Sequence, residues 1–530
     1  MSSLKIQDSI DDLSFKTPPL SDPTGVPNFP PEEGRGQDFH PFNLEYRDFK
    51  INPLPQEPLQ LFQLFIPISL IQSWIKYTNS WVSHLQENGV IDNWNTPLSE
   101  HSRILKWEGL SSATAYVWLG VVIYLGIHRE ISIDHWKAPS LGDQRPLHSI
   151  IKFIPLRRFQ LISRYLRTFD YTKINVRDES DLPKTFQAAE EWSELIQKVS
   201  TELYLPGTNL TVDECMVPFT GRSKEITLVK GKPTPVGFKV WVIAQQGFFL
   251  HLPTPKPQGK RGKLQTEIPL SNTQSVVVHL LKRLLAHRKE LPPQTHHVFT
   301  DNLFSSPQLF RLLRQLGFGA TGTARPNCGI SSEMKKIKET GRAPNGTLLK
   351  FNEVIFIPMP DKQVIQIAWK DSGVVLFLST VHTGAPHERT LKKRKLPAKK
   401  GTKAEAKELQ CLFNGDSFKM IPIPTVAAQY NDEMNHVDRG DQIRSYTTYE
   451  HRFRRGPWQA LLWSFLLEVA LANSFILQKK TRQPRWKPYS TLKAWKECIC
   501  NAIFNTYAAE GGTRKRKISI MSAAAAIRPA

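Results

Sequence analysis

Cysteine is scarce in this chain. Its 530 residues include five cysteines, and no pair has the CxxC spacing. Only Cys498 and Cys500 lie close together in the sequence. This distribution supports neither a disulfide framework nor a zinc module, and it fits a reducing, intracellular compartment.

Long hydrophobic runs are also missing. The apolar run at 113–127 is too short to cross a bilayer comfortably, and the run at 458–477 is interrupted by Gln459, Glu468 and Asn473. The opening residues MSSLKIQDSIDDLSF lack the basic start and apolar run of a secretory signal. We therefore interpret both runs as buried helices and expect no membrane partner.

Acidic residues are outnumbered by basic ones. The chain has 70 Lys and Arg against 48 Asp and Glu, which gives a formal net charge of +22. Such an excess is unusual for an enzyme of neutral small molecules and favours a polyanionic partner, either nucleic acid or an acidic membrane surface. Because the membrane option falls away, we expect nucleic acid. No P-loop, dinucleotide fingerprint or Ser-His-Asp arrangement occurs in the required context.

The length exceeds one ordinary core, so several domains are expected. Residues 1–55 are rich in Pro, Asp and Gly and are predicted to lack a core. Apolar residues at three- and four-residue spacing predict a helical domain over 56–205. At Pro206-Gly207 the hydrophobic period changes to that of strands.

Strands and helices alternate over residues 206–325. The predicted order is a strand, a hairpin turning at Gln245-Gln246-Gly247, a helix, a strand, a helix and a strand, at 209–219, 237–252, 272–285, 296–302, 306–317 and 319–325. This order matches the ribonuclease-H-like α/β fold. In that fold, carboxylates of the first and fourth strands end up side by side.

The remaining third of the chain breaks and then completes this pattern. We interpret 326–428 as a β-rich insertion with a basic run, and 429–447 as the last part of the core with an acidic helix. Residues 448–508 are predicted to form a C-terminal helical, DNA-binding part, and 509–530 a basic tail without a fold.

Four acidic residues occupy unusual places in this pattern. Asp213 stands in a strand, where acidic residues are depleted. Asp301 ends the strand HHVFTD, and Asp438 and Asp441 are three residues apart and hence on one helical face. Oxygen ligands from several carboxylates suit Mg²⁺. A pair of such ions about 4 Å apart can serve phosphodiester transfer.

Each acid has a simpler reading as well. Asp301-Asn302 is a good turn former. Asp438 and Asp441, beside Arg439 and Arg444, would by default form a solvated, charge-paired helix face. Asp213 could stand at an ordinary strand end. Only the combination, within a strongly basic protein, favours a metal site.

At this point the sequence resembles the piggyBac transposase family. The resemblance is carried by LYLPGTNLTVDECMVPFTGRSK, GFKVWVIA, FTDNLFSSPQLFRLLRQLGFGATGTARPN, WKDSGVVLFLSTVH and YNDEMNHVDRGDQIRSY, and it runs from about Leu59 to Lys480. It implies a DNA transposase with an Asp-Asp-Asp active site at Asp213, Asp301 and Asp438, and with Asp441 as a further metal-site acid.

The resemblance also implies cofactors, partners and place of action. We expect two Mg²⁺ or Mn²⁺ ions, cut-and-paste chemistry on transposon ends and joining at TTAA in double-stranded DNA. A homodimer in the nucleus is expected as well, with the helical domain 56–205 serving dimerisation and DNA binding. Two departures stand out: the GGVD of the family is Asn435-His436-Val437-Asp438, and many members carry a C-terminal Cys/His-rich zinc module that this sequence lacks. The second departure bears on recognition of transposon ends and not on the chemistry.

Basic clusters are the candidate DNA contacts. KPQGKRGK at 256–263 supplies Lys256, Lys260, Arg261 and Lys263, and HRFRRGPW at 451–458 supplies Arg452, Arg454 and Arg455. A mobile, solvated loop is the alternative for the first cluster. The runs Arg389–Lys407, with nine basic residues and one acidic, and 513–517 suit phosphate contacts or nuclear import. Trp458 and Trp463 are read as core residues.

Two functions are compatible with these patterns. The first is an active, metal-dependent transposase. The second is a domesticated, transposase-derived protein that binds DNA without catalysis. Retention of all three acids favours the first, since a carboxylate with no metal to hold is a buried, unpaired charge. The missing zinc module and His436 favour the second. A nuclease that releases its products without strand joining is a lesser variant.

Overall fold

The computed structural model describes most of the chain between residues 38 and 508. The described ranges are 38–92, 95–128, 130, 134–137, 146–173, 187–219, 226–229, 235–251, 270–286, 296–396, 410–445, 459–484 and 486–508.

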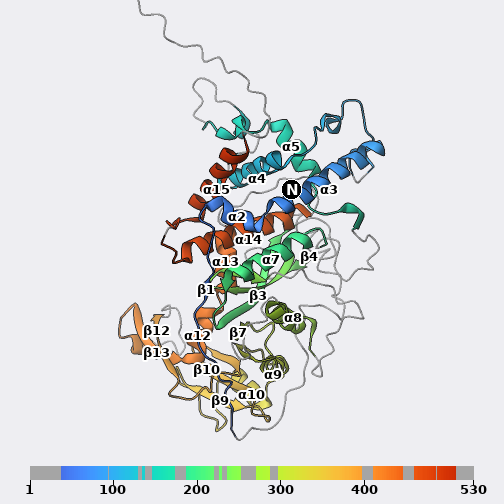
Figure 1. The fold of residues 1–530 in the computed structure, drawn as a ribbon. Coiled ribbons are helices and arrows are strands. Elements are labelled where there is room, and N and C mark those ends of the chain that lie inside the picture. The colour runs from blue at the N-terminus through green and yellow to red at the C-terminus, as the bar shows by residue number, and fades with distance from the viewer. Residues whose placement is uncertain are drawn as a thin grey trace, which may run out of the picture. The chain divides into compact units, whose positions relative to one another are not determined.

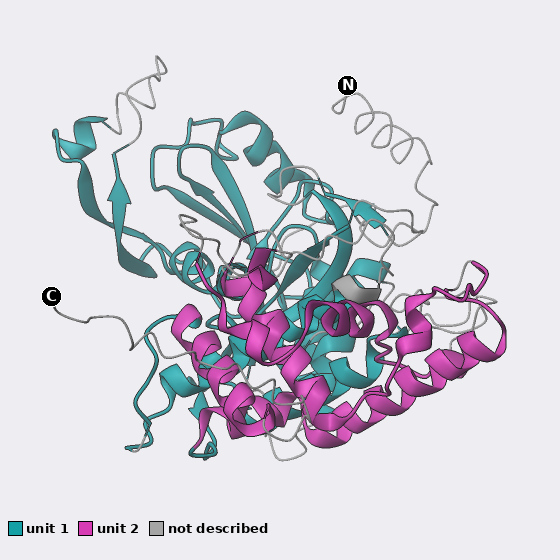
Figure 2. Cartoon of the chain, turned by 90° about the horizontal axis from the view of Figure 1, so that it is seen from above, with its two compact units in different colours: residues 1–56, 173–446, 453–492 teal, residues 57–172, 447–452, 493–530 magenta. Residues whose placement is uncertain are grey.

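The chain forms two compact units, coloured separately in Figure 2. Unit 1 comprises residues 1–56, 173–446 and 453–492, and unit 2 comprises 57–172, 447–452 and 493–530. The helix α7 (Glu190–Leu203) belongs to unit 1, although its sequence continues the helical pattern of residues 56–205. The domain boundaries drawn from the sequence stay predictions.

Unit 2 is built from helices. Its elements are α2 (Pro58–Phe65), α3 (Ile68–Glu87), α4 (Ser112–Ile127), α5 (Leu156–Tyr165), α15 (Leu492–Tyr507) and the short helices η1 (Arg103–Lys106), η2 (Asp134–Trp136), η3 (Ser149–Lys152) and η4 (Tyr171–Lys173). The helix predicted at 113–127 is confirmed as α4, which is buried along most of its length. Gly120 permits its close packing on α15, because a Cβ there would lie 2.9 Å from the Phe504 ring.

A nine-stranded sheet forms the centre of unit 1. Its order is β4-β5-β3-β7-β8-β11-β10-β9, and β6 pairs with β5 beside this path. The strands are β3 (Asn209–Pro218), β4 (Ile226–Leu228), β5 (Val236–Gln245), β6 (Phe248–His251), β7 (His296–Thr300), β8 (Phe318–Thr323), β9 (Val354–Pro358), β10 (Ile365–Lys370) and β11 (Val374–Ser379). Two smaller pairs are β1 (Lys50–Ile51) with β2 (Tyr204–Leu205), and β12 (Arg389–Lys395) with β13 (Phe418–Pro424).

The ribonuclease-H-like order is confirmed in strands β3 to β8. β3 runs antiparallel to β5 and parallel to β7, and β7 runs parallel to β8. The predicted hairpin is β5–β6, and Gln246 and Gly247 at its turn have φ of 51° and 87°. Positive φ at both central residues is what a two-residue hairpin with a type I′ turn requires.

Helices cover both faces of this sheet. They are α8 (Asn272–Ala286), α9 (Pro307–Gln315), α10 (Ser332–Thr340), α12 (Thr425–Glu433), α13 (His436–Ser445) and α14 (Gln459–Lys480). In Figure 1, α8 and α9 lie on one side of β7 and α12 on the other. Ser306 starts α9 as predicted, because its side chain accepts a hydrogen bond from the Leu309 amide and Pro307 occupies the first helical position.

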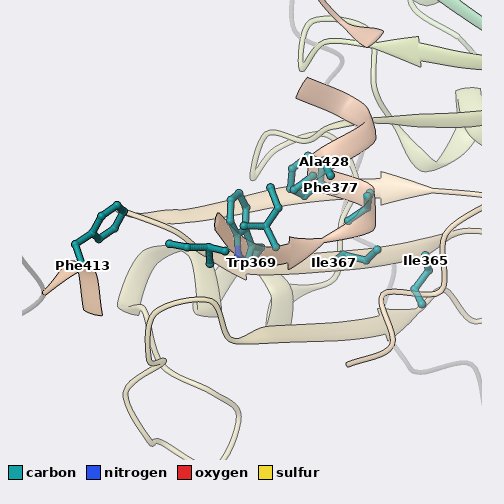
Figure 3. Packing of buried hydrophobic residues seen from close by; sticks show 10 residues of the cluster. Ile365, Ile367, Trp369, Phe377, Phe413 and Ala428 are labelled. Carbon is teal, nitrogen blue, oxygen red and sulfur yellow. The ribbon is translucent and has the colours of Figure 1, made fainter. Parts of the chain in front are cut away.

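Strands β9 to β11 come from the segment interpreted as an insertion, and they continue the central sheet. β11 pairs antiparallel with β8, with Phe377 opposite Thr323. Their buried face carries Ile367, Trp369 and Phe377, and α12 packs on it through Val426, Ala427 and Ala428, as Figure 3 shows for the cluster. Since α12 leads directly into α13, this core fixes where the acidic helix starts.

Among the described residues, no single helix has the length and apolar composition of a membrane span. The helices α2 and α3, bent by 53° relative to each other, have the length and apolar composition of a span only when taken together.

Candidate active site

Asp213 and Asp301 come from neighbouring parallel strands. The last paired residues of β3 and β7 are Val212 and Thr300. Asp213 and Asp301 are the residues that directly follow them. Side chains alternate between the faces of a sheet, and residues in register share a face. The sheet therefore brings these two carboxylates to one face at the end of β7. Asp213 is buried, with 7% of its surface exposed, and Asp301 is half-buried.

Asp301 also makes the turn that the dipeptide Asp-Asn predicts. Its Oδ1 accepts a hydrogen bond from the Leu303 amide at 2.8 Å. Its carbonyl oxygen accepts one from the Ser305 hydroxyl, also at 2.8 Å. The turn holds the Asp301 carboxylate in place after the strand. A role in the turn and a role in a metal site are therefore compatible with the same conformation.

The helix α13 lies along β3 on this face. Just before it, Thr211 donates a hydrogen bond to the carbonyl oxygen of Glu433, the last residue of α12, at 2.7 Å. At the start of α13, the Nδ1 atom of His436 lies 3.5 Å from the Thr211 hydroxyl. His436 also pairs with the Glu433 carboxylate at 3.2 Å. Burial lowers the pKa of His436 to about 4. The histidine that departs from the family's GGVD is thus buried and neutral at pH 7.

Further along, α13 contacts β3 through both residues of an ion pair within the helix. Arg444 contacts the Asp441 carboxylate at 2.5 Å and donates a hydrogen bond to the Met216 carbonyl oxygen at 3.3 Å. The Cys215 thiol donates to Asp441, and the pKa of that thiol is raised by burial and by the charge of Asp441. The guanidinium of Arg444 lies over the Phe465 ring of α14.

These contacts locate Asp438. Along β3 the order is Thr211, Asp213, Cys215, and the α13 residues that contact the first and last of these are His436 and Asp441. Asp438 lies between His436 and Asp441 in the sequence of the helix. It is exposed, in the first turn of α13. An acidic residue there is also favoured by the helix dipole.

Tyr430 is a residue of this face that the sequence patterns did not reveal. It belongs to α12, and its hydroxyl lies 3.1 Å from the Thr323 hydroxyl of β8. Its pKa is raised by burial, and the negative charges of Asp301 and Asp213 add to the effect. The tyrosine therefore interacts electrostatically with both carboxylates. An aromatic residue on a helix that packs against a sheet gives no sequence signal beyond core packing.

The structure brings Asp213 and Asp301 to one face of the sheet, whereas Asp438 is exposed on α13. Among the described residues, the four acids do not supply three ligand atoms within 4.8 Å of one another. Asp213, Asp301 and Asp438 come from two strands and a helix, and Asp441 is engaged by Arg444 and Cys215. The predicted ligands are all carboxylates, and oxygen ligands are those that Mg²⁺ and Mn²⁺ prefer.

The predicted DNA contacts lie outside the described residues. This holds for Lys256, Lys260, Arg261, Lys263, Arg452, Arg454 and Arg455. Of the basic run Arg389–Lys407, the part up to residue 396 is described, and it forms β12 of a two-stranded ribbon with β13. On this ribbon Lys392 and Arg394 pair with Asp432 and Asp371, whereas Lys393 and Lys395 are exposed.

A protein-family model described as Transposase IS4 matches residues 57–475, which is well over half of the chain. The chain belongs to this transposase family. Its curated relatives place it among the piggyBac-type members. Transposases of this DDE type use divalent metal ions.

Two of these relatives are human. The chain is 23% identical to PiggyBac transposable element-derived protein 2 over 333 residues, which cover 63% of this chain and 50% of that protein. It is 23% identical to PiggyBac transposable element-derived protein 3 over 455 residues, which cover 84% and 65%. The match to the Chimeric ERCC6-PGBD3 protein covers 36% of that protein. The chain thus spans between about a third and two thirds of these relatives.

A solved structure has the same fold. The piggyBac transposase in a cryo-EM synaptic complex with hairpin DNA superposes with a TM-score of 0.64 at 17% identity, over 87% of this chain and 83% of that one. This likeness agrees with the ribonuclease-H-like strand order of unit 1.

Proposed function

We propose that the chain is a piggyBac-like DNA transposase that cleaves and rejoins phosphodiester bonds at TTAA sites. The observation that carries this proposal is the register of β3 and β7, which brings Asp213 and Asp301 to adjacent positions on the face along which α13 lies. Asp438 completes the Asp-Asp-Asp set. Membership of a transposase family supports the reaction class.

In this proposal Asp213, Asp301 and Asp438 hold Mg²⁺ or Mn²⁺. Two bound ions would supply activation of the attacking oxygen and stabilisation of the leaving one. The chain itself orients the carboxylates: the Leu303 amide fixes Asp301, and the Glu214 amide donates to Asp213 Oδ1 at 2.8 Å. Asp441 is the fourth acid, and a metal ion would compete with Arg444 for its carboxylate.

The proposed partner is double-stranded DNA, including transposon ends and the TTAA target. The net charge of +22 supports it. The exposed Lys393 and Lys395 add a described basic surface to the seven predicted contacts. The same proposal includes a homodimer and a nuclear location, which the family resemblance supports.

A DNA-binding protein without catalysis is the second candidate. It is favoured by the exposed position of Asp438 at a helix N-terminus, which suits an aspartate without any metal, and by the turn that occupies Oδ1 of Asp301.

The deciding experiment is Mg²⁺-dependent cleavage of DNA that carries the flanking inverted repeats and TTAA. Wild type is compared with Asp301→Asn, and with Asp416→Asn as a matched control at an exposed aspartate before β13. We expect nicks and hairpins from wild type and Asp416→Asn, and none from Asp301→Asn, with DNA affinity unchanged in all three. Binding without products in wild type would instead support the non-catalytic protein.

A further inference from the structure

Unit 2 contains a cluster of imidazoles around one carboxylate, far in sequence from the catalytic acids. We call it the histidine cluster, and it consists of His128, Glu130, His135 and His148. His128 caps the C-terminal end of α4, His135 lies in η2, and His148 caps the start of η3. His135 and His148 are buried, His128 is half-buried and Glu130 is exposed.

Three of these residues have potential metal-ligand atoms close to one another. One ligand atom each of His128, Glu130 and His148 lies within 4.8 Å of the other two. The Nε2 atom of His148 is 3.7 Å from Glu130 Oε1. In a tetrahedral zinc site with bonds of about 2.0–2.1 Å, ligand atoms lie roughly 3.4 Å apart. A small contraction of side chains is therefore enough to close this set around an ion.

Two further residues orient these ligands. The Tyr124 hydroxyl lies 2.9 Å from His148 Nδ1, so that Nε2 is the nitrogen directed at Glu130. His135 Nε2 lies 3.1 Å from Glu130 Oε2 and 3.0 Å from the His128 carbonyl oxygen. Metal-binding imidazoles and carboxylates have such partners on their other polar atom, because the partner fixes the ring or the carboxylate.

A simple ion pair does not account for this arrangement. One imidazolium would satisfy Glu130, yet three imidazoles surround it. The rings of His128 and His148 lie 5.5 Å apart and those of His135 and His148 4.5 Å apart, so charging all three would place like charges side by side. Neutral imidazole is the form that offers a lone pair to a metal. The C-terminal end of α4, where His128 stands, also favours a cation.

We propose that His128, Glu130 and His148 bind a divalent transition-metal ion, with Zn²⁺ as the physiological choice. Two imidazoles and a carboxylate suit Zn²⁺, and the fourth position is left for water. Tyr124 and His135 act as positioning residues. The ion joins the end of α4 to the start of η3, and so stabilises unit 2. Its nitrogen-containing ligand set is chemically different from the all-oxygen catalytic set of unit 1.

The test uses the full chain after dialysis against a chelator. Wild type reloaded with Zn²⁺ should retain about one ion per chain after gel filtration, and with Co²⁺ it should show the visible absorption of a four-coordinate site. His128→Ala with His148→Ala should lose both signals. The control His101→Ala, an exposed histidine of the same unit, should keep them.

Two further variants make the result specific. Tyr124→Phe removes only the positioning hydroxyl and should weaken Zn²⁺ binding about 10–100-fold, as loss of a partner to a ligand does. Asp213→Asn with Asp301→Asn should leave the Co²⁺ spectrum unchanged, whether or not the chain is a transposase. The proposal is overturned if wild type gives no Co²⁺ spectrum. It is equally overturned if the spectrum depends on the aspartates, or if the double histidine variant, folded by circular dichroism, keeps its Zn²⁺.

Discussion

Asp213 and Asp301 directly follow Val212 and Thr300, which are partners in the parallel ladder of β3 and β7. This register decides which carboxylate faces α13. A slip by one residue would turn Asp213 to the other face and present Glu214 in its place, because strand side chains alternate. The pairing of two buried strands, more than any single residue, therefore defines the candidate site.

The contact between α13 and the β5–β6 hairpin depends on Gly440. A Cβ at this position would lie 2.7 Å from the Gly247 carbonyl oxygen and 2.7 Å from the Phe249 ring. We expect Gly440→Ala to displace α13 and to lower the free energy of unfolding by about 1–3 kcal/mol. Cleavage should fall with it, since Asp438 is on the same helix.

Urea denaturation and the cleavage assay measure the two effects. Gly373→Ala is the matched control, because a Cβ there meets no atom within 4 Å. A Gly440→Ala protein as stable and as active as this control would refute the close approach.

The Asp441–Arg444 pair should stabilise the fold, because the buried Arg444 would otherwise lack a partner for its charge. Asp441 itself is partly exposed. We expect Asp441→Asn to cost about 1–2 kcal/mol, reduced from the cost at a fully buried pair by solvent at the carboxylate. Arg444→Met also loses the hydrogen bond to the Met216 carbonyl oxygen, and it should lower the free energy of unfolding by about 3 kcal/mol. A double-mutant cycle by urea denaturation gives the coupling.

The same variants test whether Asp441 binds metal. If the Asp441 carboxylate only pairs with Arg444 and accepts the Cys215 hydrogen bond, Asp441→Asn should need the same Mg²⁺ concentration as wild type for half-maximal cleavage. A raised Mg²⁺ requirement would assign it to the metal set.

Acid should destabilise unit 1 through His382. Burial lowers its pKa to about 4, against about 6.5 in the unfolded chain. Between these values the unfolded state binds more protons, so stability is complete above pH 6.5 and falls as the pH drops towards 4. At pH 5 the loss from this residue is about 2 kcal/mol.

His382→Asn should remove this part of the pH dependence. Urea midpoints at pH 7 and pH 5 measure it, with His387→Asn at an exposed site as control. An unchanged difference between the two midpoints in His382→Asn would contradict a neutral, buried His382.

The β12–β13 ribbon should contribute to DNA binding through Lys393 and Lys395. Each phosphate contact releases counterions, so their joint replacement by alanine should reduce the slope of log affinity against log salt by about 2. Lys335→Ala with Lys336→Ala on α10, both exposed, removes the same charge elsewhere. Titrations of a labelled duplex at several salt concentrations compare them. Equal slopes in the two double variants would exclude the ribbon as a contact surface.

The sequence by itself determined the elements of the core. The strand at 209–218, the hairpin turning at Gln246-Gly247 and the helix capped by Ser306 were all readable, because alternation, turn residues and caps are local signals. The acids were readable too, because a charged residue in an apolar strand conflicts with its surroundings.

Only the tertiary structure decided what these elements contact. β9 to β11 gave clear strand patterns, but their pairing with β8 depends on which edge is open, and alternation does not encode that. The neighbours of Tyr430, the contact of Asp441 with Cys215 and the proximity of His128, Glu130 and His148 likewise join residues distant in sequence or separated by turns. Such contacts arise from packing of whole elements, and a single sequence carries no local signal for them.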